Sequence, residues 1–278
     1  MKKNVLITGT SSGLGRSTAL MLAAKGWQVF AGVRKEADGD SLVKEADGTV
    51  VPLLLDVAEQ DTVDAAAAHL NEATGGELHG LINNAGIYLG GPLELMSNDE
   101  IARTFAVNVT GLLSVTRACL PLLRAAEGRI INIGSISGLV AMPGVSVYAG
   151  SKHAVEAITD SLRIELQPFG VKVVVIEPGG IKTPIWQKGA QRDAERPEDP
   201  HTARLLEIYA PLVKLLEKLN ARPGGLPPED VAGVVIDALE TPRPKNRYLV
   251  GKDAKSIALL GRLPDLLRDK LISSKVWG

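Results

Sequence analysis

A tyrosine and a lysine four positions apart, Tyr148 and Lys152, are the side chains in this sequence best suited to move a proton. The stretch from Val147 to Leu166 is predicted to be helical, and side chains four apart on a helix emerge on one face, a turn apart. A phenol has an ordinary pKa of about 10, and a neighbouring ammonium favours its ionised form. We therefore expect Tyr148 to act as a general acid and base, with Lys152 tuning it. An exposed helix pair without a role is the alternative, because the spacing is common.

Two other polar residues stand where they would assist such a proton transfer. Ser135 follows a predicted strand, and a hydroxyl there can hydrogen-bond a substrate oxygen as charge develops on it, or can simply cap a turn. Asn108 interrupts an apolar helical run, and a buried asparagine needs hydrogen-bond partners. It is expected either to pack between helices or to hold a water molecule that links Lys152 to solvent.

The elements that position these residues are short β-branched runs alternating with longer helical patterns. This alternation is typical of βα units around a parallel sheet, and continuous apolar strands indicate helices on both faces. The sequence predicts an α/β fold with a doubly wound, mostly parallel seven-stranded sheet, in a single domain over residues 1–278. The expected strands are Val5 to Thr8, Val29 to Val33, Val50 to Asp56, Gly80 to Asn83, Arg129 to Ile133, Val171 to Ile176 and Arg247 to Val250. The clearest helices are Gly15 to Lys25, Thr62 to Glu72, Asp99 to Arg124 and Val147 to Leu166.

A glycine-rich turn at residues 9–15 follows the first strand and opens the first helix, with the spacing G-x-x-x-G-x-G. Glycines allow close backbone approach, and a helix N-terminus offers unpaired N–H groups and a positive dipole end to a pyrophosphate. The turn therefore predicts dinucleotide binding, although a glycine-rich turn without a ligand is the alternative. The expected contacts are Gly9, Ser11, Ser12, Gly13, Leu14 and Gly15.

The end of the second strand bears on the choice between NADP and NAD. An acid at this position would receive the ribose hydroxyls of NAD, but the chain has Arg34 and Lys35 there. A guanidinium can grip a 2′-phosphate through forked, charge-assisted hydrogen bonds, so NADP(H) is favoured over NAD(H). An ordinary solvated arginine is the alternative.

Two later strand ends complete the expected cofactor site. The carboxylate of Asp56 would accept a hydrogen bond from the adenine amino group or cap the next helix, and the sequence does not separate these readings. The N-N-A-G sequence at residues 83–86 would turn the chain tightly and lay backbone against a ribose. The expected contacts here are Asp56, Val57, Asn84, Ala85 and Gly86.

Together these motifs resemble the classical short-chain dehydrogenase/reductase family over about Asn4 to Gly251. The resemblance implies a catalytic tetrad, with its tyrosine and lysine also contacting the cofactor and its lysine bonding the nicotinamide ribose. It also implies a nicotinamide pocket around a P-G turn. A departure from the family is Gly134, where many members have a serine; we expect intact chemistry and a more flexible loop. The tetrad is Asn108, Ser135, Tyr148 and Lys152, and the pocket residues are Pro178, Gly179, Ile181 and Thr183.

The implied reaction is reversible hydride transfer between nicotinamide and a secondary alcohol or ketone, and it requires no metal. Most residues expected around the substrate are apolar, which favours a hydrophobic substrate, although the same side chains would also suit a core. A tail similar to that of the steroid and retinol dehydrogenase branch points to a lipid-like molecule. The expected lining residues are Leu89, Leu93, Ser137, Gly138, Val140, Met142, Val145, Ile185 and Trp186.

Two segments lie outside the βα pattern. Residues 184–226 are interpreted as a substrate lid, because α/β sheets bind ligands beyond the carboxyl ends of their strands; a solvated connection is the alternative. The amphipathic tail, residues 252–278, is expected to cover the substrate mouth, pack on a second subunit or touch a membrane surface. We favour subunit packing, since the family usually forms dimers or tetramers through helices equivalent to Asp99 to Arg124 and Val147 to Leu166.

The composition excludes several other classes. A net charge of −1 gives no reason to expect nucleic acid as a partner, and a lone cysteine, Cys119, suits a reducing cytoplasm. No signal peptide or transmembrane segment is expected. A nucleotide-sugar epimerase or dehydratase remains an alternative, but it would carry a G-x-x-G-x-x-G turn and a longer substrate domain. A non-catalytic NADP(H) sensor would show a damaged tetrad, whereas all four positions are filled.

Overall fold

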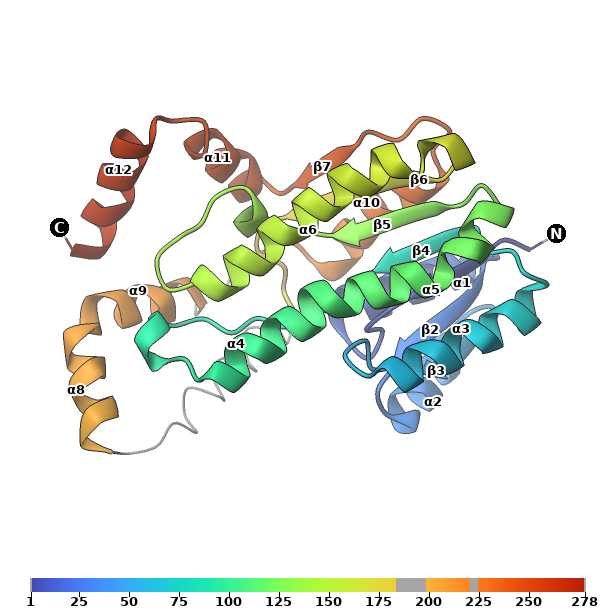
Figure 1. Cartoon of the computed structure of the whole chain (residues 1–278), viewed down its shortest axis with the longest axis horizontal. Helices are drawn as coiled ribbons and strands as arrows, with labels where there is room; N and C mark the ends of the chain where they lie inside the picture. The colour runs from blue at the N-terminus through green and yellow to red at the C-terminus, as the bar shows by residue number, and fades with distance from the viewer. Residues whose placement is uncertain (1, 184–198, 221–224, 278) are drawn as a thin grey trace.

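A parallel sheet of seven strands forms the centre of the computed structural model, which describes residues 2–183, 199–220 and 225–277. The strand order β3-β2-β1-β4-β5-β6-β7 reverses between β1 and β4, which is where doubly wound sheets bind ligands. Figure 1 shows the strands flanked by helices on both sides. The strands are β1 (Asn4–Ile7), β2 (Gln28–Val33), β3 (Val50–Leu54), β4 (Gly80–Asn83), β5 (Arg129–Ile133), β6 (Lys172–Pro178) and β7 (Arg247–Val250).

Two hydrophobic cores cover the two faces of this sheet. Successive side chains of β1 point into different cores. Val5 and Ile7 pack in the core with α1 and α10, whereas Leu6 packs in the core with α3 and α5. The helices are α1 (Gly13–Ala24), α2 (Glu36–Glu45), α3 (Gln60–Thr74), α4 (Asn98–Phe105), α5 (Leu112–Ala125), α6 (Ser146–Glu165), α8 (Pro200–Ile208), α9 (Ala210–Asn220), α10 (Pro228–Glu240), α11 (Lys252–Leu260) and α12 (Asp265–Trp277). Short helical turns are η1 (Leu93–Leu95), η2 (Ala106–Gly111), η3 (Ile136–Gly138) and η4 (Gln167–Phe169).

The predicted fold class is confirmed, but the helix predicted from Asp99 to Arg124 is not α-helical throughout. The π-helical turn η2 separates α4 from α5 and contains Asn108. A Cβ at Gly111 would lie 2.7 Å from the carbonyl oxygen of Val57, so this part of the helix runs directly against the loop after β3. Hydrophobic periodicity does not reveal such a turn, and π turns are frequent at functional sites.

The expectation that the chain has no transmembrane segment stays a prediction. The 28-residue stretch Asn98–Ala125 is long and apolar enough to cross a membrane by length and composition. In the fold its C-terminal half packs on the sheet, with Val115, Cys119 and Leu123 buried in the second core. Packing in this core therefore accounts for part of the apolar character of the stretch.

The segments predicted as lid and tail gather beyond the carboxyl ends of the strands, where Figure 1 shows α8, α9 and α12. Parts of the predicted lid, residues 184–198 and 221–224, lie outside the described residues. Helix α9 contacts α12, and α11 contacts both β7 and η3. A Cβ at Gly261, just after α11, would lie 2.7 Å from Val140 Cγ2. The tail thus packs on the segment that follows Ser135.

Candidate active site

The glycine turn is fastened to the N-N-A-G sequence across the switch point of the sheet. The side-chain amide of Asn84 donates to the carbonyl oxygens of Thr8 and Gly9, at 2.9 and 3.0 Å. The Thr8 hydroxyl accepts from the backbone N–H groups of Asn84 and Ala85, at 3.0 and 2.9 Å. A Cβ at Gly15 would lie 2.3 Å from the Gly9 carbonyl oxygen, so only glycine fits there. Asn84 therefore shapes the turn with its side chain.

The start of α1 has the features that a pyrophosphate requires. Ser12 precedes the helix in extended conformation and makes no side-chain cap hydrogen bond. No acidic residue lies in the first turn. Gly9 and Gly13 have φ of 70° and 57°, where a side chain would be strained. The first N–H groups of α1 are thus left without the usual cap, at a positive dipole end, which fits the phosphates of a dinucleotide.

Tyr148 and Lys152 lie on the same side of α6, as their spacing predicts. The ammonium nitrogen of Lys152 is 5.8 Å from the centre of the Tyr148 ring and donates a 2.8 Å hydrogen bond to the carbonyl oxygen of Ile133. Lys152 is only 7% exposed. The last residue of β5 thus fixes the ammonium beside the phenol, at the edge of the sheet where the glycine turn lies.

Burial opposes ionisation of both groups. It raises the pKa of Tyr148, and a side-chain hydrogen bond with Ser135 works against this rise. Burial also lowers the pKa of Lys152 to about 8, while the charge of Glu156 works against that change. In the protein alone, desolvation thus works against the ionised phenol that a neighbouring ammonium favours, and the acid/base role of Tyr148 stays a prediction.

Ser135 caps a turn, which is one of the two roles that the sequence left open; its contact with a substrate oxygen stays a prediction. It precedes η3, and its hydroxyl accepts a 3.1 Å hydrogen bond from the backbone N–H of Ser137. The same hydroxyl lies near enough to Tyr148 to lower the pKa of the phenol. Capping the turn therefore fixes the hydroxyl beside the phenol, where both can face one substrate oxygen.

Asn108 uses both ends of its amide to join elements. Its Nδ2 donates to the carbonyl oxygen of Ile87 and to the hydroxyl of Ser151, each at 3.0 Å, and its Oδ1 accepts from the Ile87 N–H at 2.8 Å. A Cβ at Gly86 would lie 3.4 Å from Asn108 Oδ1 and 3.9 Å from Lys152 Nζ. Asn108 is therefore a packing residue, and its predicted water link to Lys152 stays a prediction.

Tyr88 is a site residue that the sequence reasoning missed. Its buried ring meets the Tyr148 ring nearly perpendicularly, with centroids 5.1 Å apart. The available signal was its place directly after the N-N-A-G sequence and Ile87. Among the expected lining residues, Leu93 is 57% exposed on η1 and Val140 is 3% exposed. Ile185 and Trp186 lie outside the described residues.

The residues expected at the adenosine end lie beyond the next strands. Arg34 and Lys35 directly follow β2, are exposed, and form no hydrogen bond or ion pair through their side chains with the described parts of the chain. The Asp56 carboxylate accepts a 3.1 Å hydrogen bond from the Ala58 N–H, whereas Glu59 is the residue that precedes α3. Asp56 therefore closes a local turn and does not cap α3, which was one of its two possible roles; the other, a contact with adenine, stays a prediction.

The P-G turn after β6 is held by the tail. The Gly180 N–H donates to Asp253 Oδ2 at 2.7 Å, and a Cβ at Gly179 would lie 2.2 Å from the same atom. Ile181 forms a parallel bridge with Leu226. The Thr183 N–H donates to the Ile181 carbonyl oxygen at 2.9 Å. Residues 178–183 therefore form a tight loop at the edge of the sheet that also carries Ser135.

A buried charge cluster, also missed from the sequence, lies behind Lys152. Arg247 of β7 pairs with Glu156 of α6 and with Glu177 of β6. A Cβ at Gly134 would lie 2.8 Å from Glu156 Oε1, which gives this glycine a packing reason. The Gly134 N–H is bound to the Ile176 carbonyl oxygen at 2.8 Å, so the loop is anchored at the position where we expected flexibility.

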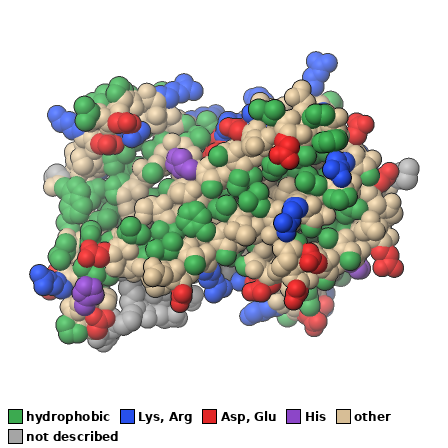
Figure 2. All heavy atoms as spheres, in the orientation of Figure 1, with side chains coloured by type: hydrophobic (Ala, Val, Ile, Leu, Met, Phe, Trp, Pro, Cys, Tyr) green, Lys and Arg blue, Asp and Glu red, His purple; other side chains and the backbone are tan. Residues whose placement is uncertain are grey.

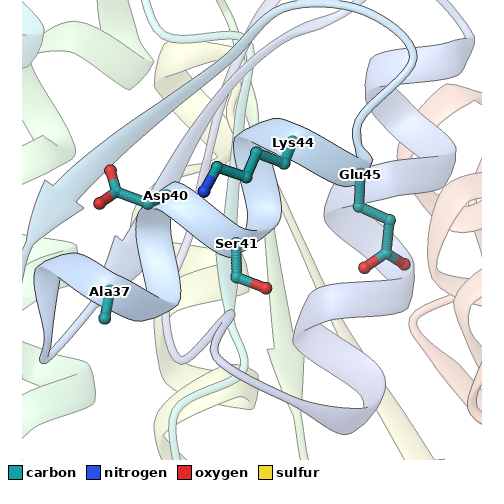
Figure 3. A pocket seen from close by; sticks show the side chains of 5 residues that line it. All are labelled: Ala37, Asp40, Ser41, Lys44 and Glu45. Atoms are coloured by element: carbon teal, nitrogen blue, oxygen red, sulfur yellow. The ribbon is translucent and has the colours of Figure 1, made fainter.

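Two open hollows elsewhere on the described surface are lined by none of the four tetrad residues. Figure 3 shows one on the outer side of α2, where Lys44 and Glu45 lie at its rim. Arg16 of α1 bridges the two helices there, pairing with Glu45 at 2.5 Å and donating to the Ser41 hydroxyl at 3.1 Å. These contacts hold α2 against α1 and carry no reactive group toward the sheet edge.

Comparisons with known proteins place these features in the class of nicotinamide-dependent oxidoreductases. The family model for short chain dehydrogenase matches residues 3–194, and the chain belongs to that family. It is 36% identical over 273 residues to an NADPH-dependent 3-dehydrocapnine reductase of Ornithobacterium rhinotracheale, covering 96% of this chain and 94% of that one. It is 37% identical over 286 residues to retinol dehydrogenase 7 of Rattus norvegicus, covering 99% and 88%. A short-chain dehydrogenase structure from Streptomyces avermitilis matches with a TM-score of 0.79 and 30% identity, covering 98% and 96%.

Proposed function

We propose that this oxidoreductase uses NADP(H) to interconvert a hydrophobic ketone and its secondary alcohol, with Tyr148 as the acid/base. The single observation that carries the proposal is the juxtaposition of Tyr148, Lys152 and Ser135 at the carboxyl edge of the sheet. The Ser135 hydroxyl lowers the pKa of the phenol, and the centre of the phenol ring lies 5.8 Å from the Lys152 ammonium.

Each side chain has a proposed part in the reduction. Ser135 holds the carbonyl oxygen as negative charge develops on it, and Tyr148 delivers the proton to that oxygen. The charge of Lys152 then stabilises the phenolate that remains. Asn108 holds the loop after β4 against α6 through Ile87 and Ser151. Bound nicotinamide supplies the hydride, while these residues supply orientation and the proton.

The preference for NADP(H) is inferred from Arg34. Its exposed guanidinium follows the strand tip directly and forms no ion pair with the described residues, so it is available to a 2′-phosphate. The uncapped start of α1 would hold the pyrophosphate, and the loop at residues 178–183 would hold the nicotinamide end. One relative, the 3-dehydrocapnine reductase, is named as NADPH-dependent.

The hydrophobic substrate is inferred from what surrounds the tetrad. Tyr88 presents a buried ring beside Tyr148. Val140, which follows Ser135 and η3, packs against Gly261. A relative named for retinol supports the same direction, because retinol is an apolar molecule.

Two assays test the proposal. The first compares NADPH with NADH as the reductant in a panel of ketosteroids, retinoids, acyl thioesters and sugars, following absorbance of the reduced cofactor. We expect turnover of apolar ketones with NADPH; activity confined to sugars, or preference for NADH, would contradict the proposal. The second assay uses Tyr148→Phe, which should lose about 100-fold or more in kcat while still binding NADPH. Near-normal turnover by this variant would exclude the assigned acid/base.

A further inference from the structure

A second buried charged side chain, Glu156, follows Lys152 by one turn of α6. Glu156 and Glu177 are 7% and 1% exposed, and Arg247 pairs with both, lying 3.0 Å from Glu177 Oε1. The other guanidinium nitrogen pairs at 2.6 Å with Asp160, whose side chain is 44% exposed. The proton transfer described above uses none of these three acids.

The carboxylate of Glu156 lies directly beneath the loop that carries Ser135. Cβ atoms at Gly134 and Gly138 would lie 2.8 and 3.2 Å from Glu156 Oε1. This oxygen is buried and has no hydrogen-bond partner among the described residues. Arg247 holds the other oxygen, Oε2. Gly134 and Gly138 thus leave room for the Glu156 carboxylate, and Arg247 of β7 fixes its position. An ion pair that served only stability would not need to lie under the loop that carries Ser135.

We propose that Glu156 is a positioning residue for the reaction, whose buried carboxylate, held by Arg247, stabilises the ammonium form of Lys152. The inference rests on the roles proposed for Tyr148 and Lys152. Asp160 also pairs with Arg163. When Glu156 and Glu177 are both ionised, Arg247 therefore neutralises one of their two negative charges, and Lys152 balances the other. Because a buried charge is costly unless it is compensated, removal of the Glu156 charge penalises the ammonium most directly.

The charged groups around Glu156 act in opposite directions. Burial and the charge of Glu177 together raise the pKa of Glu156 to about 7, although Arg247 works against this rise, so the carboxylate is the main form only above neutral pH. In turn Glu156 raises the pKa of Lys152 against the effect of burial, which leaves it at about 8. Without Glu156, burial acts on Lys152 unopposed, and the ammonium loses its proton at lower pH. Asp160 also pairs with Arg247 but lies a further turn away along α6.

The test measures the ionisation of Lys152 directly, in the full-length enzyme saturated with NADPH. Enzyme labelled with 13C at the lysine ε-carbon is titrated by NMR, and the Lys152 signal is assigned by its absence in Lys152→Arg. The variants are Glu156→Gln, Glu156→Asp and, as the matched control, Asp160→Asn. In parallel, the rate of NADPH-dependent reduction of 5α-dihydrotestosterone is measured from pH 6 to 10.

In Glu156→Gln the Lys152 titration should move about one pKa unit lower, and the falling limb of the reduction rate should move with it. Glu156→Asp keeps the charge and should fall between this variant and the wild type. Asp160→Asn should leave the titration unmoved. An unchanged Lys152 titration in folded Glu156→Gln or, if that variant does not fold, in Glu156→Asp overturns the inference. A uniform loss of rate at every pH, without a shift, shows a structural role only. Failure of the wild type to reduce the ketone would count against the proposed substrate class, and the NMR titration would still decide the role of Glu156.

Discussion

The ring of Tyr88 meets the ring of Tyr148 edge to face, with the centroids 5.1 Å apart and the planes at 76°. Tyr88 follows the N-N-A-G sequence, whose Asn84 fastens the glycine turn, and Tyr148 lies near the start of α6. One aromatic contact therefore connects the expected cofactor site to the proposed acid/base.

Replacing Tyr88 with leucine should lower kcat, because the Tyr148 ring loses its edge contact. Such aromatic pairs contribute about 0.5–1.5 kcal/mol, which corresponds to about 2- to 10-fold in rate if the contact acts mainly in the transition state. Tyr88→Phe retains the ring and should lose less. Steady-state kinetics at saturating NADPH measures this difference. Equal losses in both variants would show that ring packing is not the cause.

The reduction rate should fall as pH rises through about 8. Lys152 is protonated below its lowered pKa of about 8 and loses its charge above it, so the phenolate left on Tyr148 is then less stabilised. The raised pKa of Tyr148 keeps the proton donor itself protonated over the same interval. Rates of ketone reduction from pH 6 to 10, with NADPH affinity measured as a control, test the prediction. A rate that stays constant between pH 7 and 9 would contradict it.

Arg34→Glu should raise KM for NADPH by about 10- to 150-fold, the effect expected from losing charge-assisted hydrogen bonds to a phosphate. NADH has no 2′-phosphate, so its KM should change little or improve. Lys44→Gln is a suitable control, because it removes a cation from the outer side of α2 (Figure 3). Similar losses for NADPH in Arg34→Glu and Lys44→Gln would point to general electrostatics.

Gly15→Ala should destabilise the protein and weaken cofactor binding, since the added Cβ would lie 2.3 Å from the Gly9 carbonyl oxygen and 2.4 Å from Asn84 Nδ2. Overpacking of this kind costs about 1–3 kcal/mol, or about 2–10 °C in Tm. Gly233→Ala, within α10, meets no atom within 4 Å and should raise Tm slightly through helix propensity. Thermal unfolding with and without NADPH compares the two. A Gly15→Ala protein with unchanged Tm and affinity would disprove the requirement for glycine.

The apolar face over α4, α5 and α6 should mediate self-association as a dimer or tetramer. Figure 2 shows apolar side chains gathered on this face, and Phe105 and Leu113 are 38% and 40% exposed. Leu113→Lys should shift the protein toward monomers in light scattering coupled to size exclusion. Leu54→Lys, a similarly exposed leucine at the end of β3, is the control. A wild-type monomer at micromolar concentration would rule out the prediction.

Local patterns in the sequence were enough to predict the sheet, because strands and helices leave their period in the apolar residues. The strands Gly80–Asn83, Arg129–Ile133 and Arg247–Val250 were predicted with the bounds that the structure has. The spacing of Tyr148 and Lys152 likewise predicted a shared helix face. These relationships are local, so neighbouring residues determine them.

Contacts between distant segments were decided only by the tertiary structure. The π turn around Asn108 ends at Gly111, which lies against Val57, and the cluster of Glu156, Glu177 and Arg247 joins α6, β6 and β7. The shifted pKa values of Tyr148 and Lys152 arise from burial, which depends on every element packed around them. Sequence by itself therefore determined which groups can do the chemistry and where along the chain they lie, whereas folding decided their solvation and partners, because desolvation and long-range charge depend on the whole packed surroundings.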